Sequence, residues 1–496
     1  MTAGRASPAD GKRLTTPVGE QMSKKIGGVV ALLGLCALSL FLLSCGSSSS
    51  RPSGVLYVLT QGINGYGNNV SSFAMDLNSG NLSLVNYNAS TCTTAASITN
   101  PEPCGLPLDI LLDPTGATAF VLNQGVPSAG VAPAIYAYTV NSDGSLGTPA
   151  VVPTPSLMAG DTAVAMVRDA AGQFLFVIDQ GSFPSPGYPT PSPTNPSCPH
   201  VPASPTDVCP SISVFAMKPG STTLTLASGS PVYLSKIPTA LSAITFTPTT
   251  PAGAPSQELL FVTNNSDICT ANCVLPPHSD NTVSLYAVSS SGSLTEQVNS
   301  PYIVSAIDPI SVLAVNTNPA EQNTGGVFVY VGNEDQNGGH LYPFQLCTVV
   351  NAVCTAQDVG SNLMTPLGET CSQPPCNNVP PTSVGLNPVA MLVDPTNNFL
   401  YVVSQGSNQV FAFRINTTAG TLSALTPANQ PTGSQPVAMA MHPSVYIDGT
   451  YTGQFLYTSN TNSDNITGFT LSTTSGSMSS PITVIAPAAP SGMTAR

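Results

Sequence analysis

Two columns of polar side chains follow a short apolar-aromatic motif that recurs along the chain. The first column stands three residues after each aromatic residue and consists of Thr60, Asn123, Asp179, Asn264, Asn333, Ser404 and Asn460. The second stands one residue later and consists of Gln61, Gln124, Gln180, Asn265, Glu334, Gln405 and Thr461. We expect both columns to surround one mouth of a repeat structure. These side chains could bind a ligand or could cap turns. Turn capping is the stronger alternative in the first column, because Asn, Asp, Ser and Thr at strand ends often hydrogen-bond the backbone of their own turns.

The charged groups in and beside these columns have the most obvious chemistry. Asp179, Glu334 and Asp335 are carboxylates, and His340 follows Asp335 closely along the chain. A carboxylate can act as general base for water that attacks a carbonyl carbon, and a histidine can assist it or serve as the acid. On this hypothesis the candidate catalytic residues are Glu334, His340 and Asp179. The competing interpretation is that the Glu334-Asp335 pair is simply solvated.

A larger set of side chains is suited to holding a ligand by hydrogen bonds. Asp109 belongs to it because it interrupts a column that otherwise holds Val, Ala or Ser. The candidate ligand-binding residues are Asp109, Asn123, Gln124, Gln180, Asn333, Asp335 and Gln405. An alternative use of Asn333, Glu334 and Asp335 is a Ca²⁺ site, since hard cations prefer oxygen ligands. Apart from that alternative we expect no metal and no cofactor.

Composition excludes several function classes. The formal net charge is -13, with only 11 Lys and Arg residues, and five of these precede residue 26. A nucleic-acid binder needs clustered Lys and Arg to neutralise phosphates, so the expected partner is another protein or a neutral small molecule. The sequence also has no Gly-x-Ser-x-Gly elbow, no metal-binding His pair and no phosphate-binding glycine loop. These absences disfavour the common hydrolase classes.

The elements that must position these residues are strands arranged in seven repeats. Their first-strand triplets are Leu56-Tyr57-Val58, Ala119-Phe120-Val121, Leu175-Phe176-Val177, Leu260-Phe261-Val262, Val329-Tyr330-Val331, Leu400-Tyr401-Val402 and Leu456-Tyr457-Thr458. A second strand follows each triplet, with an apolar pattern like that of Val70, Phe73 and Met75. The last two of these side chains point to the same face of a strand, so each repeat offers an apolar pair that only a neighbouring repeat can bury.

Further strands complete each repeat. Six of the seven repeats carry a near-continuous apolar run before the triplet, as a strand covered on both faces would. A fourth strand follows glycine turns such as Ser79-Gly80-Asn81-Leu82. This pattern predicts an all-β fold, a seven-bladed β-propeller of four-stranded antiparallel blades over residues 54–490, with a pair of β-sandwiches as the alternative. The first repeat lacks an inner strand, so either the C-terminal segment closes the ring, with Pro481 to Pro487 as candidate, or that blade has three strands.

The N-terminus reads as an export signal. Lys24-Lys25 precede an apolar run over residues 26–43, and a Ser-rich stretch follows Cys45. A basic start, an apolar stretch and a small residue before the cleavage site are typical of a secretory signal. Leu42-Leu43-Ser44-Cys45 resembles a bacterial lipobox, which implies a lipid on Cys45. We therefore expect a signal over 1–45, a linker over 46–53 and a lipoprotein held in the bacterial cell envelope by its membrane lipid.

Two alternatives stay open at this end of the chain. Met22 is an alternative start, because the segment from Met22 reads as a complete signal of ordinary length. A single transmembrane anchor is the alternative to lipidation, since eighteen apolar residues can just span a bilayer. Either interpretation places the folded part outside the cytoplasm.

Ten cysteines downstream of the signal fall into close pairs. In an oxidising compartment this spacing predicts five local disulfides, Cys92-Cys104, Cys198-Cys209, Cys269-Cys273, Cys347-Cys354 and Cys371-Cys376. Metal binding is the competing interpretation, and no second pair or His lies at a fitting distance for it. Four of the five pairs fall in loops that emerge on one face of the predicted propeller, which would stiffen that face for recognition.

The stretch from Pro388 to Leu422 carries a family resemblance. It reads Pro-x-x-Met-x-x-Asp-Pro, then Phe-Leu-Tyr-Val-x-Ser-Gln-Gly-Ser-Asn-x-Val-x-x-Phe-x-Ile and Gly-x-Leu. This closely resembles the lactonase-family seven-bladed propeller, which includes 6-phosphogluconolactonase-like proteins and proteins with Tyr-Val-Thr-Asn repeats. Asn333-Glu334 and Asp179-x-Gly181 are similar to motifs of those lactonases. The chain lacks their His-x-His segment and nearly lacks basic residues, which argues against a phosphorylated sugar as substrate.

Two hypotheses about function follow from these features. The first is an envelope-anchored propeller that binds a ligand or protein or acts as a scaffold. The second, implied by the resemblance, is a lactone or sugar-lactone hydrolase that uses carboxylates at the channel mouth.

Overall fold

The computed structural model describes most of the propeller in detail. The described residues are 54–61, 68–92, 104–126, 130–157, 161–181, 209–234, 236–246, 256–267, 281–297, 300–304, 308–317, 326–335, 338–346, 364–367, 380–442, 446–447, 450–451 and 454–496. The chain divides into two units, 1–50 and 51–496, and the expected signal and linker lie outside the described residues. Within the described part, no helix has the length and apolar character needed to cross a membrane.

Seven antiparallel sheets follow one another, which confirms the predicted seven-bladed β-propeller of four-stranded blades. Blade 2 consists, from the axis outward, of β4 (Leu106–Leu112), β5 (Thr118–Gln124), β6 (Ala134–Thr139) and β7 (Ala150–Val152). Blade 3 consists of β8 (Ala163–Arg168), β9 (Phe174–Asp179), β10 (Ser211–Met217) and β11 (Leu224–Leu226), with β12 (Val232–Tyr233) also beside β10. Blade 4 consists of β13 (Lys236–Phe246), β14 (Gln257–Asp267), β15 (Thr282–Val288) and β16 (Leu294–Glu296), with β17 (Tyr302–Ile303) also beside β15.

The second half of the ring repeats this plan. Blade 5 consists of β18 (Pro309–Asn316), β19 (Val327–Asp335), β20 (Gly338–Leu346) and β21 (Met364–Pro366), with β22 (Thr382–Ser383) also beside β20. Blade 6 consists of β23 (Pro388–Val393), β24 (Phe399–Ser404), β25 (Gln409–Ile415) and β26 (Leu422–Pro431). Blade 7 consists of β27 (Pro436–His442), β30 (Gln454–Asn460), β31 (Asn465–Leu471) and β32 (Ile482–Ile485). A hairpin of β28 (Tyr446–Ile447) and β29 (Thr450–Tyr451) and a short 3-10 helix η2 (Thr461–Ser463) complete the described elements.

Blade 1 closes the ring with strands from both ends of the propeller. The C-terminal β33 (Pro490–Ala495) is its innermost strand, followed by β1 (Val55–Thr60), β2 (Asn69–Met75) and β3 (Leu82–Ser90). The C-terminal segment therefore closes the ring as expected, but the choice of Pro481 to Pro487 is wrong, because Ile482–Ile485 form the outer strand of blade 7. The last strand also runs to Ala495, past the expected boundary at residue 490.

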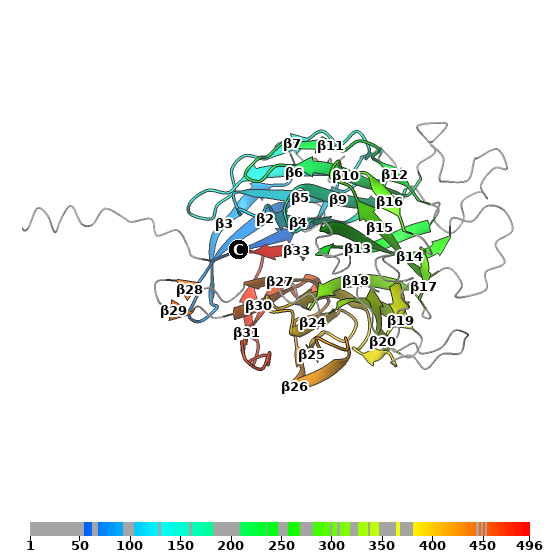
Figure 1. Cartoon of the computed structure of the whole chain (residues 1–496). Coiled ribbons are helices and arrows are strands. Elements are labelled where there is room, and N and C mark those ends of the chain that lie inside the picture. The colour runs from blue at the N-terminus through cyan, green and yellow to red at the C-terminus, as the bar shows by residue number, and fades with distance from the viewer. Residues whose placement is uncertain are drawn as a thin grey trace, which may run out of the picture. The chain divides into compact units, whose positions relative to one another are not determined.

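Close packing against blade 2 requires a glycine in the strand that closes the ring. A Cβ atom on Gly492 of β33 would lie 2.6 Å from the carbonyl oxygen of Leu108 on β4. Only glycine fits at such an approach of two backbones. The inner strands contact one another in the closed order β33, β4, β8, β13, β18, β23, β27 and back to β33. Figure 1 shows β33, β4, β13, β18 and β27 gathered around the middle of the ring.

The apolar side chains are buried between blades. Seven clusters of buried apolar residues occur, one at each interface between adjacent blades. At the interface of blades 7 and 1, for example, Leu56 and Phe73 pack with Phe455 and Tyr457. Removal of such aromatic and aliphatic side chains from water is the main stabilising contribution, and each blade supplies only half of each cluster.

Tyrosine hydroxyls add a recurrent hydrogen bond across four of these interfaces. Each comes from the second strand of one blade and donates to a turn glycine of the next blade. The pairs are Tyr57 to Gly144 at 2.9 Å, Tyr330 to Gly420 at 2.8 Å, Tyr401 to Gly476 at 2.7 Å and Tyr457 to Gly80 at 2.7 Å. Blades 2, 3 and 4 carry Phe120, Phe176 and Phe261 at this position, so apolar packing acts there without the hydroxyl.

Candidate functional site

The first polar column is buried and bonded within the propeller. All seven residues, Thr60, Asn123, Asp179, Asn264, Asn333, Ser404 and Asn460, have no more than 1% of their surface exposed. Asn123 Nδ2 donates to the carbonyl oxygens of Thr91 (2.8 Å) and Cys104 (3.1 Å). Asn460 Nδ2 donates to Asn465 Oδ1 at 2.7 Å. Asn123 therefore holds the loop that precedes its blade, whereas Asn460 bonds across the turn that follows its own strand.

The second column bridges one blade to the next. Gln61 Nε2 donates to the carbonyl oxygen of Pro107 at 3.2 Å, and Gln180 Nε2 donates to that of Pro238 at 3.1 Å. Thr461 Oγ1 likewise donates to the carbonyl oxygen of Pro490 at 2.7 Å. Each of these carbonyls belongs to one of the first residues of the next inner strand, so the bonds join blades 1 and 2, blades 3 and 4, and blades 7 and 1 at the mouth end.

Gln124 and Gln405 differ from the other glutamines of this column. Both side chains are partly exposed, and no side-chain hydrogen bond of either is found in the described part of the chain. Their predicted role in ligand binding stays a prediction, as does that of Gln180, whose amide group already bridges two blades.

Asp179 lies in a buried pair of carboxylates. Its oxygens accept hydrogen bonds from Ser211 Oγ at 2.6 Å and from the backbone N–H of Gly181 at 3.1 Å. Burial, and next the negative charge of Asp161, hold the pKa of Asp179 well above its usual range. Asp161 is itself buried and was not among the sequence candidates. The signal that could have found it is its place just before β8, whose first residue Ala163 pairs with Asp179.

Asp109 is the carboxylate that stands on the innermost strand. It is partly exposed, and its Oδ1 accepts from the backbone N–H of Ile110 at 2.8 Å while Oδ2 accepts from that of Met166 on the next blade at 3.1 Å. Burial raises the pKa of Asp109 to about 6, against the opposing effect of these two N–H groups. The side chain thus joins the inner strands of blades 2 and 3 and titrates near neutral pH.

Strand register shows that Asp109 interrupts a column of small residues. A bulge near the start of each inner strand places one residue of each at the same level. The equivalents of Asp109 are Ala165, Ala240, Ser311, Ala390, Ala438 and Gly492. All six equivalents are small and uncharged, so Asp109 is the charged residue at this level of the ring.

The blade 5 candidates lie at the end of one hairpin. Asn333 on β19 is directly opposite His340 on β20, and His340 is opposite Ser383 on β22. Asn333 is fully buried and His340 is partly exposed. Glu334 and Asp335 are at the end of β19, but their side chains lie outside the described residues. The catalytic role of Glu334 and His340 and the Ca²⁺ alternative therefore stay predictions.

The candidates are distributed over four blades. Asp109, Asn123 and Gln124 belong to blade 2, Asp179 and Gln180 to blade 3, the Asn333–His340 group to blade 5 and Gln405 to blade 6. Asp109 accepts a hydrogen bond from Met166 of blade 3, and Asp179 lies near Asp161, but neither partner was a candidate. No group of three His, Cys, Asp or Glu side chains suited to a metal ion occurs among the described residues.

Comparisons with known proteins agree with this architecture. Residues 390–491 match the family model described as Lactonase, 7-bladed beta-propeller. The fold is that of the lactonase-family propellers. A search of curated proteins found no match to the chain.

Solved structures of lactonase-like propellers cover most of the chain. A periplasmic gluconolactonase from Pseudomonas aeruginosa has a TM-score of 0.54 and 13% identity over 89% of this chain and 98% of its own. A candidate 6-phosphogluconolactonase from Bacteroides uniformis has a TM-score of 0.53 and 12% identity over 89% of this chain and 99% of its own. A similar protein from Bacteroides fragilis has a TM-score of 0.53 and 10% identity over 91% and 99%. At these identities the likeness concerns the fold.

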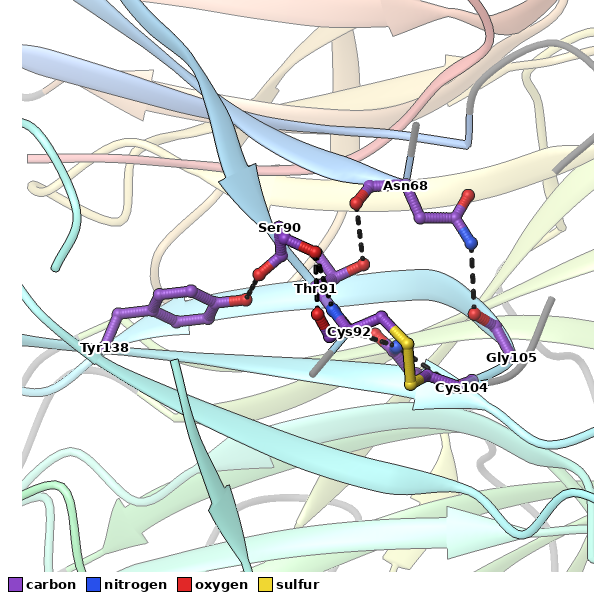
Figure 2. The surroundings of a disulfide bond; sticks show 8 residues. Asn68, Ser90, Thr91, Cys92, Cys104, Gly105 and Tyr138 are labelled. Carbon is purple, nitrogen blue, oxygen red and sulfur yellow. Dashed lines mark hydrogen bonds between the residues drawn. A yellow bond between two sulfur atoms is a disulfide. The ribbon is translucent and has the colours of Figure 1, made fainter. Parts of the chain in front are cut away.

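One disulfide stiffens the mouth end of this lactonase-like propeller. Cys92 is bonded to Cys104, as predicted, and joins the end of blade 1 to the start of blade 2. Figure 2 shows the hydroxyl of Tyr138 directed at the carbonyl oxygen of Ser90, to which it donates at 2.6 Å. Asn123 holds the same segment through Cys104. Blade 2 therefore anchors both sides of this loop by the disulfide and by hydrogen bonds.

The other cysteine predictions are largely outside the described residues. Cys209 is disulfide-bonded, and its expected partner Cys198 lies outside them. The remaining predicted pairs, Cys269-Cys273, Cys347-Cys354 and Cys371-Cys376, and the proposed lipid site Cys45 lie outside them as well.

Proposed function

We propose that this protein is an exported, lipid-anchored hydrolase of unphosphorylated lactones, with Asp109 as its general base. The observation that carries the proposal is the position of Asp109, a partly exposed residue on the innermost strand, whose carboxyl has a pKa that burial raises to about 6. The match of residues 390–491 to the lactonase model supports it. So does the similarity of fold to a periplasmic gluconolactonase.

Hydrolysis of a lactone requires a general base and an ordered water molecule from the protein. A carboxyl with a pKa near 6 is mostly ionised at neutral pH and still basic enough to accept a proton in the transition state. Two of its four acceptor positions are used by Ile110 and Met166, which leaves others for water. Asp109 takes a proton as the water oxygen bonds to the lactone carbonyl carbon. The ring C–O bond then breaks, and the proton passes to the leaving oxygen.

The distribution of basic residues supports an unphosphorylated substrate. Arg168 ends an inner strand on the side opposite the mouth, where Lys218 follows β10 and Arg496 donates to the carbonyl oxygen of Gly116. Lys236, at the start of β13, is the basic residue described at the mouth end. One lysine offers a phosphate group little of the bidentate recognition that arginines provide.

A binding or scaffold module is the second candidate function. The specific observation in its favour is the first polar column, in which every residue is buried. A mouth with its polar side chains buried, beside a loop that the Cys92–Cys104 disulfide stiffens, suits recognition of a partner without turnover.

A lactone panel tests the proposal. The full-length protein is assayed on five- and six-membered sugar lactones with and without a phosphate group, alongside Asp109→Asn and Glu334→Gln variants. The matched control is Asp143→Asn, which changes an exposed turn carboxylate at the opposite end. We expect turnover of unphosphorylated lactones that Asp109→Asn lowers by about 10²-fold or more, the usual size of a general-base contribution.

Other outcomes would count against parts of the proposal. Turnover abolished by Glu334→Gln but kept by Asp109→Asn would move the base to blade 5. No turnover of any lactone by the wild-type protein would overturn the hydrolase and favour the binding module.

A further inference from the structure

Exposed aliphatic side chains gather on one part of the propeller's rim. Among the described side chains, seven large hydrophobic residues are exposed. Five of them lie on the outermost strands of blades 7, 1 and 2, namely Leu84 and Val85 on β3, Val151 on β7, and Ile482 and Ile485 on β32. We call these five the aliphatic rim. The other two, Ile303 on β17 and Leu386 before β23, belong to other parts of the ring.

Register shows that part of the aliphatic rim continues an interblade core outward. Leu84 is paired with Phe73, which lies in the cluster between blades 7 and 1. Ile482 is paired with Gly468, which is itself paired with Tyr457 of the same cluster. Directly paired residues share a face of the sheet, so Leu84 and Ile482 face each other's blade at the solvent end of that core.

Blade 2 extends the rim on the other side of blade 1. Val151 is paired with Tyr136, which lies in the cluster between blades 1 and 2. Val151 is 51% exposed, Leu84 49% and Ile485 86%. None of β3, β7 and β32 carries a charged residue, although charges normally protect exposed edge strands. An uncharged aliphatic edge is costly in water and favourable at a lipid surface.

The chain leads from the proposed lipid into blade 1, whose outermost strand carries two residues of the aliphatic rim. β1 begins at Val55 in blade 1, the middle blade of the three. About nine residues separate it from Cys45, and a chain of that length spans at most ~32 Å when fully extended. Leu56 of β1 is paired with Phe73 of β2, and Phe73 is paired with Leu84 of β3. Leu84 therefore lies two strand spacings, ~10 Å, from Leu56. A lipid on Cys45 would therefore hold the start of blade 1 within that distance of the bilayer.

We propose that the aliphatic rim of blades 7, 1 and 2 rests on the membrane surface and inserts its side chains at the headgroup boundary. The occupant of this surface is a lipid bilayer, and the inference rests on the lipid anchor of the proposed function. With its edge against the bilayer, the propeller holds both ends of its channel open to solvent.

Tryptophan fluorescence tests this inference directly, because the chain contains no tryptophan. Full-length protein carrying Leu84→Trp or Ile482→Trp is reconstituted into vesicles with brominated lipids, which quench tryptophan at known depth. The matched control is Ile303→Trp, at an aliphatic residue of blade 4 that is 63% exposed. We expect the two rim variants to be quenched several-fold more than the control, with emission shifted to shorter wavelength. Two rim positions are used so that one poorly folded variant does not decide the result.

The outcomes separate this inference from the anchor and from other occupants. Mass spectrometry of the same sample establishes whether Cys45 is acylated. If Cys45 is acylated and quenching is equal at all three positions, the contact between the aliphatic rim and the bilayer is overturned while the lipid anchor stands. If Cys45 is not acylated, the lipid anchor on which the inference rests is absent and the inference is overturned with it. A blue shift at Leu84→Trp that grows with protein concentration without vesicles would overturn it in favour of a second copy of the chain. The lactone assay is independent of all these results.

Discussion

The hydroxyl of Tyr457 donates a 2.7 Å hydrogen bond to the carbonyl oxygen of Gly80 and so links blade 7 to blade 1. This contact joins strands that are far apart in sequence at the interface where the ring closes. It acts beside the pairing of β1 with β33, which places the two ends of the propeller in one sheet. Closure therefore depends on a backbone ladder, an apolar cluster and one buried hydroxyl.

Removal of that hydroxyl should destabilise the closed ring. We expect Tyr457→Phe to lower the free energy of unfolding by about 1–2 kcal/mol, because the buried Gly80 carbonyl loses its donor. Urea unfolding measures the change, and Tyr330→Phe, which breaks the equivalent bond to Gly420, is the control at another interface. Unchanged midpoints in both variants would show that the tyrosine hydroxyls contribute nothing.

The turn glycine that receives this bond should tolerate no side chain. Gly80 has a φ of +72°, and a Cβ atom there would lie 2.4 Å from a ring carbon of Phe455. We expect Gly80→Ala to cost about 2–5 kcal/mol from the left-handed backbone and the clash together. Gly220, with a φ of +76° and nothing within 4 Å, is the matched control and should cost about 1–2 kcal/mol as alanine. Equal costs in urea unfolding would show that crowding plays no part.

The buried carboxylate pair makes stability depend on pH. The folded-state pKa of Asp179 is above its unfolded value near 3.9, so ionisation opposes folding. The pair's contribution is fully present below about pH 4 and is lost as the pH rises through the folded pKa. Asp161→Asn removes the repelling charge and should raise Tm relative to wild type more at pH 8 than at pH 4. A difference that is the same at both pH values would contradict the coupling, and Asp143→Asn controls for net charge.

The rate of the proposed hydrolysis should follow the ionisation of Asp109. With a pKa of about 6, the base is protonated and inactive in acid, so kcat/KM should rise with pH through about 6 and level off above it. Ionisation also opposes folding here, because this pKa is raised above its unfolded value, so stability falls over the same window. A pH-rate profile from pH 4.5 to 8 checks the first point. A flat profile across pH 6 would exclude Asp109 as the base.

Much of the fold could be predicted from the repeat pattern. Aromatic residues such as Tyr57 and Phe73 recur at fixed places in seven units, and no unit can bury them alone. The disulfide Cys92–Cys104 could be predicted for a similar local reason, since short spacing favours pairing wherever the compartment is oxidising. The closing strand could not, because Pro490–Ala495 has one large apolar residue, Met493, and the role of its other residues appears only when β4 packs against Gly492.

The candidate site divides in the same way. The polar residues at strand ends could be located from the sequence, because period-two strands and repeat spacing are local properties. Their roles depend on the packing of the blades. The first column is buried, Gln61 and Gln180 donate to carbonyl oxygens of the next blade, and Asp161 lies beside Asp179. Burial, charge proximity and hydrogen-bond partners arise between blades, and no single repeat contains that information.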